Sequence, residues 1–480
     1  MLDLEPVIGL EIHAQLLTRT KLFCACPTEF GAEPNSNICE VCSGQPGALP
    51  RMNGKALELA ATAGLALGSR VNSRSLFSRK NYFYPDLPNG FQTSQLDPPI
   101  CEGGSLSFRT ADGGTKSARL NRVHLEDDAG KCVHDEKRGV SLVDLNRAGT
   151  PLIEIVTEPD LSSSYEAMEF LKKLHALLVF LKVTEGRMEE GEFRCDVNIS
   201  LRPRGSSQLG VRGEIKNLNS FKFVGQAIEY EIVRQTALYE RGEPVLQETL
   251  HFDSRKGETR SLRSKEEAHD YRYFPQPDLP PVVVPEATIE ALRRGLPESP
   301  ERARERLVAL GLREAQIALL LERVEFLEYF DQALAQGGES GKIASLMEEL
   351  FLPQCQKEGI SPLEAPMKPA FLASLAKILA SGAVGRRKIQ ELFGELYLSG
   401  RDPAALLEAK GASQISDEGA LREIVAGVIA KFPQDARKYA AGEEKVLSFL
   451  VGKVMKESGG RANPQKAAEL LKAELAPRGV

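Results

Sequence analysis

The stretch VIGLEIHAQL, residues 7–16, decides how the first part of this chain folds. Apolar and polar residues alternate along it, so that Ile8, Leu10 and Ile12 share one side of an extended strand. Glu11 and His13 share the opposite side. Such alternation is typical of an antiparallel sheet that packs one face on a core and leaves the other face wet. The sequence therefore predicts a sheet with an acid and an imidazole on its polar face.

Four segments farther along repeat this pattern of one apolar and one polar face. They are RVHLEDD (122–128), TPLIEIVTEPD (150–160), FRCDVNISLR (193–202) and GEIKNLNSFK (213–222). With helices expected at 54–66 and 163–181, they predict an α+β domain built on an antiparallel sheet. The polar residues on these faces include Arg122, His124, Glu126, Glu154, Arg194, Asp196, Asn198, Glu214 and Lys216.

The composition of these polar faces favours a phosphate and metal site. An ordinary solvated face carries Lys, Thr and Ser, whereas these faces carry Glu, His, Asp, Asn and Arg. Carboxylates bind Mg²⁺, and arginine binds phosphate through a planar fork of donors. The alternative is a wet face without chemistry, and for Glu154 an ion pair with a nearby arginine. No G-x-x-x-x-G-K-[ST] loop, G-x-G-x-x-G turn or kinase signature occurs, so phosphate binding would be of another type.

Four of the eight cysteines lie close together in KLFCACPTEFGAEPNSNICEVC, residues 21–42. Their spacing is C-x-C, twelve residues and then C-x-x-C, and four thiolates can close a tetrahedral structural zinc site. Four reduced thiols without a metal and a redox-active disulfide are the alternatives. A zinc ion held by four protein ligands has no open position, so it would be structural. The predicted ligands are Cys24, Cys26, Cys39 and Cys42.

The chain is long enough for several domains, because 480 residues exceed what one hydrophobic core usually organises. The proline-rich segment PQPDLPPVVVPEA (275–287) ends the sheet domain, and helical patterns follow it from Ser299-Pro300-Glu301 onward. We therefore predict a catalytic domain at 1–294 that includes the cysteine-rich knuckle at 24–42, an all-helical domain at 295–405, and a small helical tail domain at 406–480.

Charge and hydropathy narrow the possible locations and partners. A net charge of −6 argues against a general nucleic-acid binder. The segment 445–478 is locally basic, however, with seven basic residues against three acids, and its exposed lysines suit RNA contact; a solvated helix face is the alternative. No apolar stretch is long enough for a membrane span and the first residues are acidic, so we expect a cytoplasmic protein.

Longer strings of the sequence resemble one family, the GatB subunits of the bacterial aspartyl/glutamyl-tRNA amidotransferase. The matching strings run in the family's order from residue 7 to residue 465 and are far more specific than the short motifs above. They are VIGLEIH, FGAEPNSN, RKNYFYPDLPNGFQTSQ, HLEDDAGK, SLVDLNRAGTPLIEIVTEPD, EEGEFRCDVNISLRP, EIKNLNSF, DYRYFPQPDLPP and FLVGKVMKESGGRANPQ.

The resemblance implies a cradle-shaped first domain, a helical domain and a tail domain of the YqeY type. It also implies a carbon–nitrogen ligase: ATP phosphorylates the side-chain carboxylate of Glu-tRNA(Gln) or Asp-tRNA(Asn), and ammonia then displaces phosphate. The implied partners are GatA, the glutaminase that makes ammonia from glutamine, the small protein GatC, which completes a heterotrimer, and the mischarged tRNA. Which of the two tRNAs is the substrate stays open. The alternatives are the archaeal GatE, which carries an inserted domain missing here, and a non-catalytic zinc-containing scaffold that presents tRNA.

The resemblance and the residue chemistry together assign roles to individual positions. Mg²⁺ is expected on His13, Glu126 and Glu154, and the choice of His13 rests on the resemblance because imidazole is an unusual ligand for this hard ion. Five residues are the catalytic candidates, three are candidates for binding ATP, and four in the tail are candidates for binding tRNA. These are, in order, Glu11, His13, Asp196, Glu214 and Lys216; Arg79, Arg194 and Asn198; and Lys445, Lys453, Lys456 and Arg461.

Overall fold

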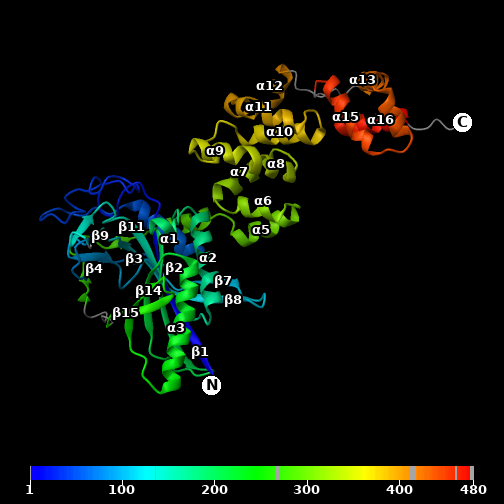
Figure 1. The fold of residues 1–480 in the computed structure, drawn as a ribbon. Coiled ribbons are helices and arrows are strands. Elements are labelled where there is room, and N and C mark those ends of the chain that lie inside the picture. The colour runs from blue at the N-terminus through cyan, green and yellow to red at the C-terminus, as the bar shows by residue number, and fades with distance from the viewer. Residues whose placement is uncertain (1, 136, 265–270, 411–417, 460–461, 476–480) are drawn as a thin grey trace. The chain divides into compact units, whose positions relative to one another are not determined.

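The computed structural model describes residues 2–135, 137–264, 271–410, 418–459 and 462–475 and divides the chain into two compact units (Figure 1). The first unit is Met1–Ser299 and contains all the strands among the described residues. The second unit is Pro300–Val480 and is helical. The α+β class is therefore confirmed, with strands in the first part and helices in the second.

A ten-stranded sheet organises the first unit. Its strands follow the order β15-β14-β13-β12-β1-β11-β8-β6-β2, and β7 pairs with β8 beside this path. All pairs are antiparallel except β13 and β14, which are parallel, so the prediction of an antiparallel sheet was wrong for that pair. The strands are β1 (Leu4–Gln15), β2 (Arg70–Val71), β6 (Cys101–Glu102), β7 (Ser105–Arg109), β8 (Thr115–Asp127), β11 (Pro151–Thr157), β12 (Phe193–Pro203), β13 (Gly213–Leu218), β14 (Glu248–Asp253) and β15 (Glu258–Ser264).

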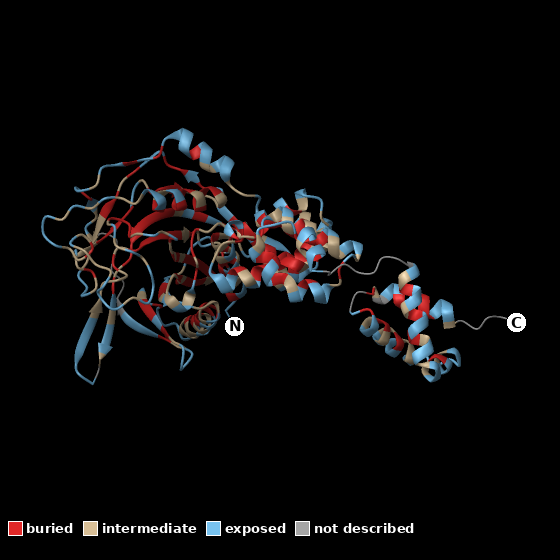
Figure 2. Ribbon diagram, turned by 90° about the horizontal axis from the view of Figure 1, so that it is seen from above, coloured by how far each residue is buried: buried red, intermediate tan, exposed pale blue. Residues whose placement is uncertain are grey.

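The core lies on one face of this sheet, where the apolar residues of the alternating strands gather. Ile8, Leu10 and Ile12 of β1 are buried in one hydrophobic cluster with residues of three helices. These helices are α1 (Gly54–Ala66), α2 (Ser164–Phe180) and α3 (Phe221–Arg241). Figure 2 shows the buried interior of the unit in red. Because alternate residues point to opposite faces, the polar residues of the same strands lie on the face away from this cluster.

Helix α2 begins at a side-chain cap that the sequence contains. The Ser163 hydroxyl accepts a hydrogen bond from the Glu166 backbone amide at 3.1 Å, which satisfies one donor of the first turn. Four residues of α2 are fully buried against the sheet and its neighbours, so the position of this helix determines much of the core packing. They are Phe170, Leu171, Leu174 and Leu178.

We expect Ser163→Ala to lower the free energy of unfolding of the first unit by about 1 kcal/mol, because the amide at the start of α2 loses its acceptor. Chemical denaturation followed by circular dichroism measures the change. Ser107→Ala, which alters an exposed hydroxyl in β7, is the control and should change the stability by less than about 0.5 kcal/mol. Equal stability of the two variants would contradict the capping role.

Three small sheets and one further α-helix complete the first unit. The strands β4 (Ser78–Asn81), β5 (Phe91–Ser94) and β16 (Phe274–Pro275) form a sheet in the order β16-β4-β5. The other two sheets are β9 (Lys131–Asp135) with β10 (Val140–Asp144), and β3 (Arg74–Ser75) with β17 (Val282–Val283). Helix α4 (Glu286–Gly295) adds Ile289 to the core, so the first unit continues beyond the proline-rich segment.

The second unit is made of short helices, and its first helix starts at Pro300, as the capping signal predicted. The tail has a hydrophobic cluster of its own that includes Leu421, Leu450 and Leu471. The domain boundaries at 294 and 405 stay predictions. The helices are α5 (Pro300–Ala309), α6 (Glu314–Leu320), α7 (Val324–Ala335), α8 (Ser340–Leu346), α9 (Leu352–Glu358), α10 (Pro369–Ser381), α11 (Arg386–Ser399), α12 (Pro403–Ala409), α13 (Glu418–Lys431), α14 (Pro433–Ala440), α15 (Lys445–Glu457) and α16 (Pro464–Leu475).

Candidate active site

Strand register brings the predicted polar residues together on the open face of the large sheet. His13 of β1 lies opposite Glu154 of β11 on one side and opposite Arg194 of β12 on the other. Glu154 in turn lies opposite His124 of β8. In the adjacent row, Glu11 lies opposite Asp196. Four strands that are far apart in the sequence therefore present one continuous polar surface.

The first cluster on this surface contains the three residues predicted to bind Mg²⁺. One ligand atom from each of His13, Glu126 and Glu154 lies within 4.8 Å of the others. His124, which the sequence analysis placed on this face without a role, stands between the acids. Its Nε2 atom lies 2.9 Å from Glu126 Oε1 and 3.1 Å from Glu154 Oε2. His13 Nε2 lies 3.5 Å from Glu154 Oε2.

The protonation states of this cluster are set by mutual attraction against burial. Burial disfavours the charged form of His124, but the Glu154 charge and the bonds to both acids raise its pKa to about 9. The pKa of Glu154 is held well below its usual range, because His124 outweighs the desolvation of the carboxylate. The pKa of His13 is also raised, since the bond to Glu154 outweighs burial.

Two buried atoms of this cluster lack a partner among the described residues, and they fit a bound cation and its surroundings. Glu126 Oε2 and His124 Nδ1 have no hydrogen-bond partner. A buried carboxylate oxygen without a donor carries a desolvation cost that a metal ion or a substrate donor would offset. The donor set therefore fits Mg²⁺, while the role of each residue as a ligand stays a prediction.

The second cluster lies in the neighbouring row and joins Glu11, Asp196 and Glu214, whose nearest oxygens all lie within 4.8 Å of one another. Lys216 is its cation: Nζ lies 3.0 Å from Glu214 Oε1 and 3.4 Å from Asp196 Oδ2. Asn198 donates to Glu11 Oε1 at 2.9 Å. Burial, and then the charges of Glu154, Glu214 and Asp196, raise the pKa of Glu11. The pKa of Lys216 is raised, because the nearby acids outweigh its burial.

Two residues near the first cluster were missed by the sequence analysis. The pKa of Lys80 on β4 is raised, because the charges of Glu126, Tyr273 and Glu154 outweigh its burial. Burial raises the pKa of Tyr273 to about 12, and Glu126 and Glu154 contribute. The available signal was the alternation in SRKN (78–81), where neighbouring basic residues point to opposite sides.

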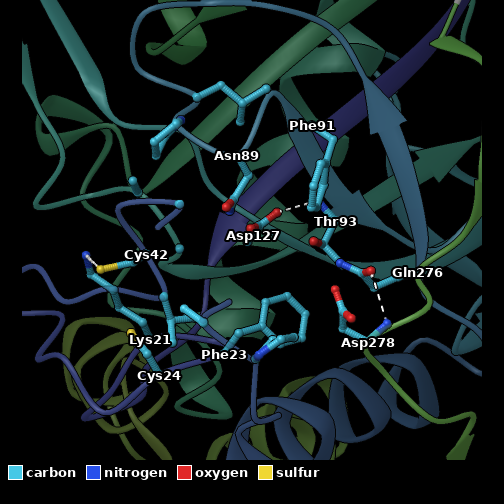
Figure 3. Close-up of a pocket in the computed structure, with 18 of the residues that line it drawn as sticks. Lys21, Phe23, Cys24, Cys42, Asn89, Phe91, Thr93, Asp127, Gln276 and Asp278 are labelled. Carbon is cyan, nitrogen blue, oxygen red and sulfur yellow. Dashed lines mark hydrogen bonds between the residues drawn. The ribbon is translucent and has the colours of Figure 1, made fainter. Parts of the chain in front are cut away.

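The structure places Arg79 away from both acidic clusters. Its Nε atom donates to Gln276 Oε1 at 2.9 Å, its Nη2 atom lies 3.0 Å from Asp278 Oδ2, and its guanidinium stacks on the Phe91 ring. These residues line a cavity of about 230 Å³ that also borders Cys24 and Cys42 (Figure 3). With its guanidinium engaged in this wall, Arg79 is a weaker candidate for gripping phosphate than the sequence analysis expected.

Arg194 lies on the polar face but already has an acidic partner. Its Nη2 atom donates to Asp128 Oδ1 at 3.0 Å, and Arg147 Nε lies 3.6 Å from Asp128 Oδ2. Gln15 also donates to Asp128 at 2.8 Å. The two arginines outweigh burial and lower the pKa of Asp128. Arg194 thus links the segment after β8 to β12, and a phosphate would compete with Asp128 for its guanidinium.

The four cysteines of the predicted zinc site lie together, with their sulfur atoms within 4.8 Å of one another. Cys42 Sγ lies 3.9 Å from Cys26 Sγ and 4.0 Å from Cys39 Sγ, and it accepts a hydrogen bond from the Cys39 amide at 3.2 Å. All four are free cysteines, and N–H···S bonds of this kind favour thiolates. Four converging thiols therefore fit the predicted zinc ion, which stays a prediction.

The tail lysines differ in their surroundings. Lys445 and Lys456 are exposed on α15, opposite the buried Leu450 and Val454. Lys453 is only half-exposed, because its ammonium lies 4.9 Å from the centroids of two aromatic rings, those of Phe432 and Phe449. The fourth candidate, Arg461, lies outside the described residues.

A sheet face with clustered acids, imidazoles and cations belongs to an enzyme that handles phosphate and metal, and comparison with known sequences defines its class. Residues 6–290 match the family model described as the GatB/GatE catalytic domain, and residues 328–475 match the one described as the GatB domain. The class is that of the ligases that form amides on tRNA.

Curated relatives identify the family. The chain is 49% identical over 479 residues to the B-type subunit of aspartyl/glutamyl-tRNA(Asn/Gln) amidotransferase from Anaeromyxobacter sp. strain K, covering 98% of this chain and 99% of the relative. The corresponding protein of Solidesulfovibrio magneticus is 48% identical, with 98% and 99% coverage, and that of Oleidesulfovibrio alaskensis is 47% identical, with 99% and 100% coverage. The chain belongs to the GatB family of amidotransferase subunits, so the prediction from the sequence strings is confirmed and the non-catalytic scaffold does not fit.

No helix among the described residues combines the length and the apolar character that crossing a membrane requires.

Proposed function

We propose that the polar face of the large sheet transfers a phosphoryl group from ATP to the side-chain carboxylate of glutamate or aspartate on a mischarged tRNA. The observation that carries this proposal is the adjacency of two acidic clusters, one around Glu154 with two imidazoles and one around Glu11 with Lys216. One cluster suits a phosphate-bound cation and the other suits a small cationic or ammonia-like reactant.

The proposed reaction has two balanced steps. A carboxylate oxygen of the aminoacyl group attacks the γ-phosphorus of ATP, the bond to the β,γ-bridging oxygen breaks, and ADP leaves with its electron pair. Ammonia then attacks the acyl carbon, a proton passes to a base, and inorganic phosphate leaves. Phosphoryl transfer depends mainly on positioning and on neutralising negative charge.

The residues of the first cluster would hold Mg²⁺ through His13, Glu126 and Glu154. The ion would supply positive charge next to the phosphate oxygens. Lys80 is aimed at the same region, since Glu126 and Glu154 act on its charge, and we assign it the phosphoryl oxygens of the substrate. Arg194 is a candidate for the same task if phosphate displaces Asp128.

The residues of the second cluster would receive ammonia. Glu11, Asp196 and Glu214 attract an ammonium ion, and a carboxylate is the base that can take its proton. Asn198 orients Glu11 through a bond of 2.9 Å, and Lys216 limits the repulsion between the acids. We assign Asn198 to positioning here in place of the ATP contact expected from the sequence.

The proposed assembly follows from the names of the relatives, each of which is one lettered component of an aspartyl/glutamyl-tRNA(Asn/Gln) amidotransferase. We propose that this chain works in the cytoplasm as part of a heterotrimer, with the glutaminase GatA, which supplies ammonia from glutamine, and with the small protein GatC. Zinc on the four cysteines would have a structural role.

We expect the double variant Lys445→Glu/Lys456→Glu to weaken tRNA binding uniformly and to lower the slope of log affinity against log salt by roughly 1 to 2, because two phosphate contacts are lost. Filter binding at several salt concentrations measures both quantities. Lys388→Glu/Lys410→Glu, on two other exposed lysines of the same unit, is the matched control. Equal losses in the two double variants would show that α15 has no special role.

An oxygen label tests the proposed chemistry itself. If the carboxylate attacks phosphorus, Glu-tRNA labelled with ¹⁸O in its side-chain carboxylate must give one labelled oxygen in the released phosphate for each amide formed. Phosphate without the label would mean that ATP hydrolysis is not coupled through an acyl-phosphate, and the proposal would be wrong.

A further inference from the structure

Lys21 is a fully buried lysine between the cysteine cluster and the segment 144–150 (Figure 3). Its ammonium lies 3.4 Å from Cys42 Sγ and donates to the Leu145 carbonyl oxygen at 3.2 Å. Among the residues that the structure describes, no carboxylate lies within 4.0 Å of this ammonium.

A buried ammonium without a carboxylate needs another negative group, because the interior of a protein stabilises an isolated charge poorly. Within the described part of the chain, the only sulfur at hydrogen-bond distance is that of Cys42, one of the four predicted zinc ligands. Four thiolates around a divalent ion carry an excess of negative charge, so a thiolate site and a buried ammonium stabilise each other.

The segment 144–150 continues this contact toward the active site. Gly149 donates its amide to the Asp128 carbonyl at 2.8 Å, and Asp128 donates its own amide to the Thr150 carbonyl at 2.9 Å. Arg147 reaches the Ala129 carbonyl at 2.9 Å and the Asp128 carboxylate at 3.6 Å. Asp128 lies two residues after Glu126 and also binds Arg194.

The cysteine-rich loop holds the same segment at a second point. Asn35 accepts a hydrogen bond from the Leu145 amide at 2.8 Å and donates to the Val143 carbonyl at 2.9 Å. The Asn37 amide donates to Asn146 Oδ1 at 2.8 Å. These bonds fix the loop to the outside of the segment, whereas Lys21 is the buried contact to the cysteines themselves.

We propose that Lys21 is a positioning residue that couples the cysteine site to the active-site sheet: its ammonium neutralises part of the thiolate charge and fixes segment 144–150, which holds Asp128. The proposal rests on the proposed zinc ion but not on the proposed phosphoryl transfer. It makes zinc binding and the order of segment 144–150 interdependent, although the ion lies outside the two acidic clusters.

The test uses the full chain with Lys21→Met, which keeps the length of the side chain but removes its charge. Lys55→Met, on an exposed lysine that pairs with Glu58, is the matched control. Zinc content and the rate of zinc release to a chelator are measured first. Amide hydrogen exchange of 144–150 is then measured in the wild type and in Lys21→Met, each with zinc and after zinc removal, with β14 as the internal reference for folding.

We expect zinc release from Lys21→Met to be about tenfold faster than from the wild type, in the range found when groups around metal ligands are removed. Exchange of 144–150 should rise in this variant and in the zinc-free wild type, and zinc removal from the variant should add little. Lys55→Met should match the wild type throughout.

Three results would overturn the proposal: unchanged zinc release in Lys21→Met, faster release with unchanged exchange in 144–150, or fully additive effects of the variant and zinc removal. A rise in exchange across β14 as well would show general unfolding instead of a local coupling, and Lys21→Arg, which keeps the charge, must then restore zinc retention for the proposal to stand. A wild type that binds no zinc would also overturn it, while the ¹⁸O experiment would remain a separate test of phosphoryl transfer.

Discussion

Glu154→Gln is expected to lower the rate of amide formation on Glu-tRNA by roughly 10³-fold, which is at the upper end of what losing one electrostatic contact at a reacting group costs. Glu154 is the residue of the first cluster that contacts both imidazoles, at 3.5 Å from His13 and 3.1 Å from His124. Glutamine keeps the shape of the side chain but removes its charge. The site then loses an anionic ligand for the proposed cation and the partner that keeps His124 charged.

The fold and the tRNA affinity of this variant should be retained, because the apolar face of β11 is unchanged and the tail lysines are elsewhere in the sequence. Single-turnover amide formation, thermal denaturation and filter binding measure the three properties. Glu58→Gln, on an exposed residue of α1, is the matched control and should leave all three unchanged. A loss of tRNA affinity that accounts for the whole rate effect would contradict a chemical role for Glu154.

Lys216→Met is expected to lower the rate of amide formation by about 10²-fold, a typical contribution of a group that sets proton transfer. Lys216 is the cation at 3.0 Å from Glu214 and 3.4 Å from Asp196, so its removal leaves three neighbouring acids with less compensation. The pKa of Glu11, already raised by burial and by those acids, then rises further.

The pH dependence gives this prediction its sign. A carboxylate that takes a proton from ammonium must be ionised, so activity is present above its pKa and is lost as the pH falls through that value. A higher pKa therefore moves the acidic limb of the rate profile upward, and part of the activity lost in Lys216→Met should return as the pH rises. Rates with free ammonium salts as donor measure this, with Lys222→Met, on an exposed lysine, as the control. A uniform loss at every pH would contradict it.

The strands of the site could be predicted from the sequence because alternation is a local property. Ile8, Leu10 and Ile12 are buried as their spacing predicted, and Glu11 and His13 lie on the other face. The neighbours of a strand are not local, however. Glu154 faces His13 because β11 pairs with β1, although about 140 residues separate them, and only the strand order shows this.

Arg79 and Lys80 show where reading residue types reaches its limit. The sequence analysis selected Arg79, because arginine suits phosphate best. In the structure Arg79 turns to Gln276 and Asp278, and Lys80, its neighbour on β4, faces the acids. Which of two adjacent basic residues faces the site depends on the pairing of β4 with β5 and β16, and that pairing is not written in the local pattern.

The cysteine site was the easiest part to predict, since its four members lie within nineteen residues and the loop between them brings them together. The roles of the residues came from another source. Chemistry alone led to metal-assisted phosphate handling, and the long ordered strings led to the family that the comparisons confirm. The tail lysines show the opposite limit, because only exposure, and not residue type, separates Lys456 from Lys453.

The central claim is that this chain phosphorylates the aminoacyl group, and the most direct measurement is transfer of labelled γ-phosphate from ATP to Glu-tRNA without glutamine or ammonia. The wild type, with its proposed partner proteins present, should place label on the aminoacyl end of the tRNA, Glu58→Gln should do the same, and Glu154→Gln should place almost none. Equal labelling by the wild type and Glu154→Gln would contradict the assigned site. No labelling by the wild type, with amide formation intact once ammonia is added, would contradict the phosphoryl-transfer account itself.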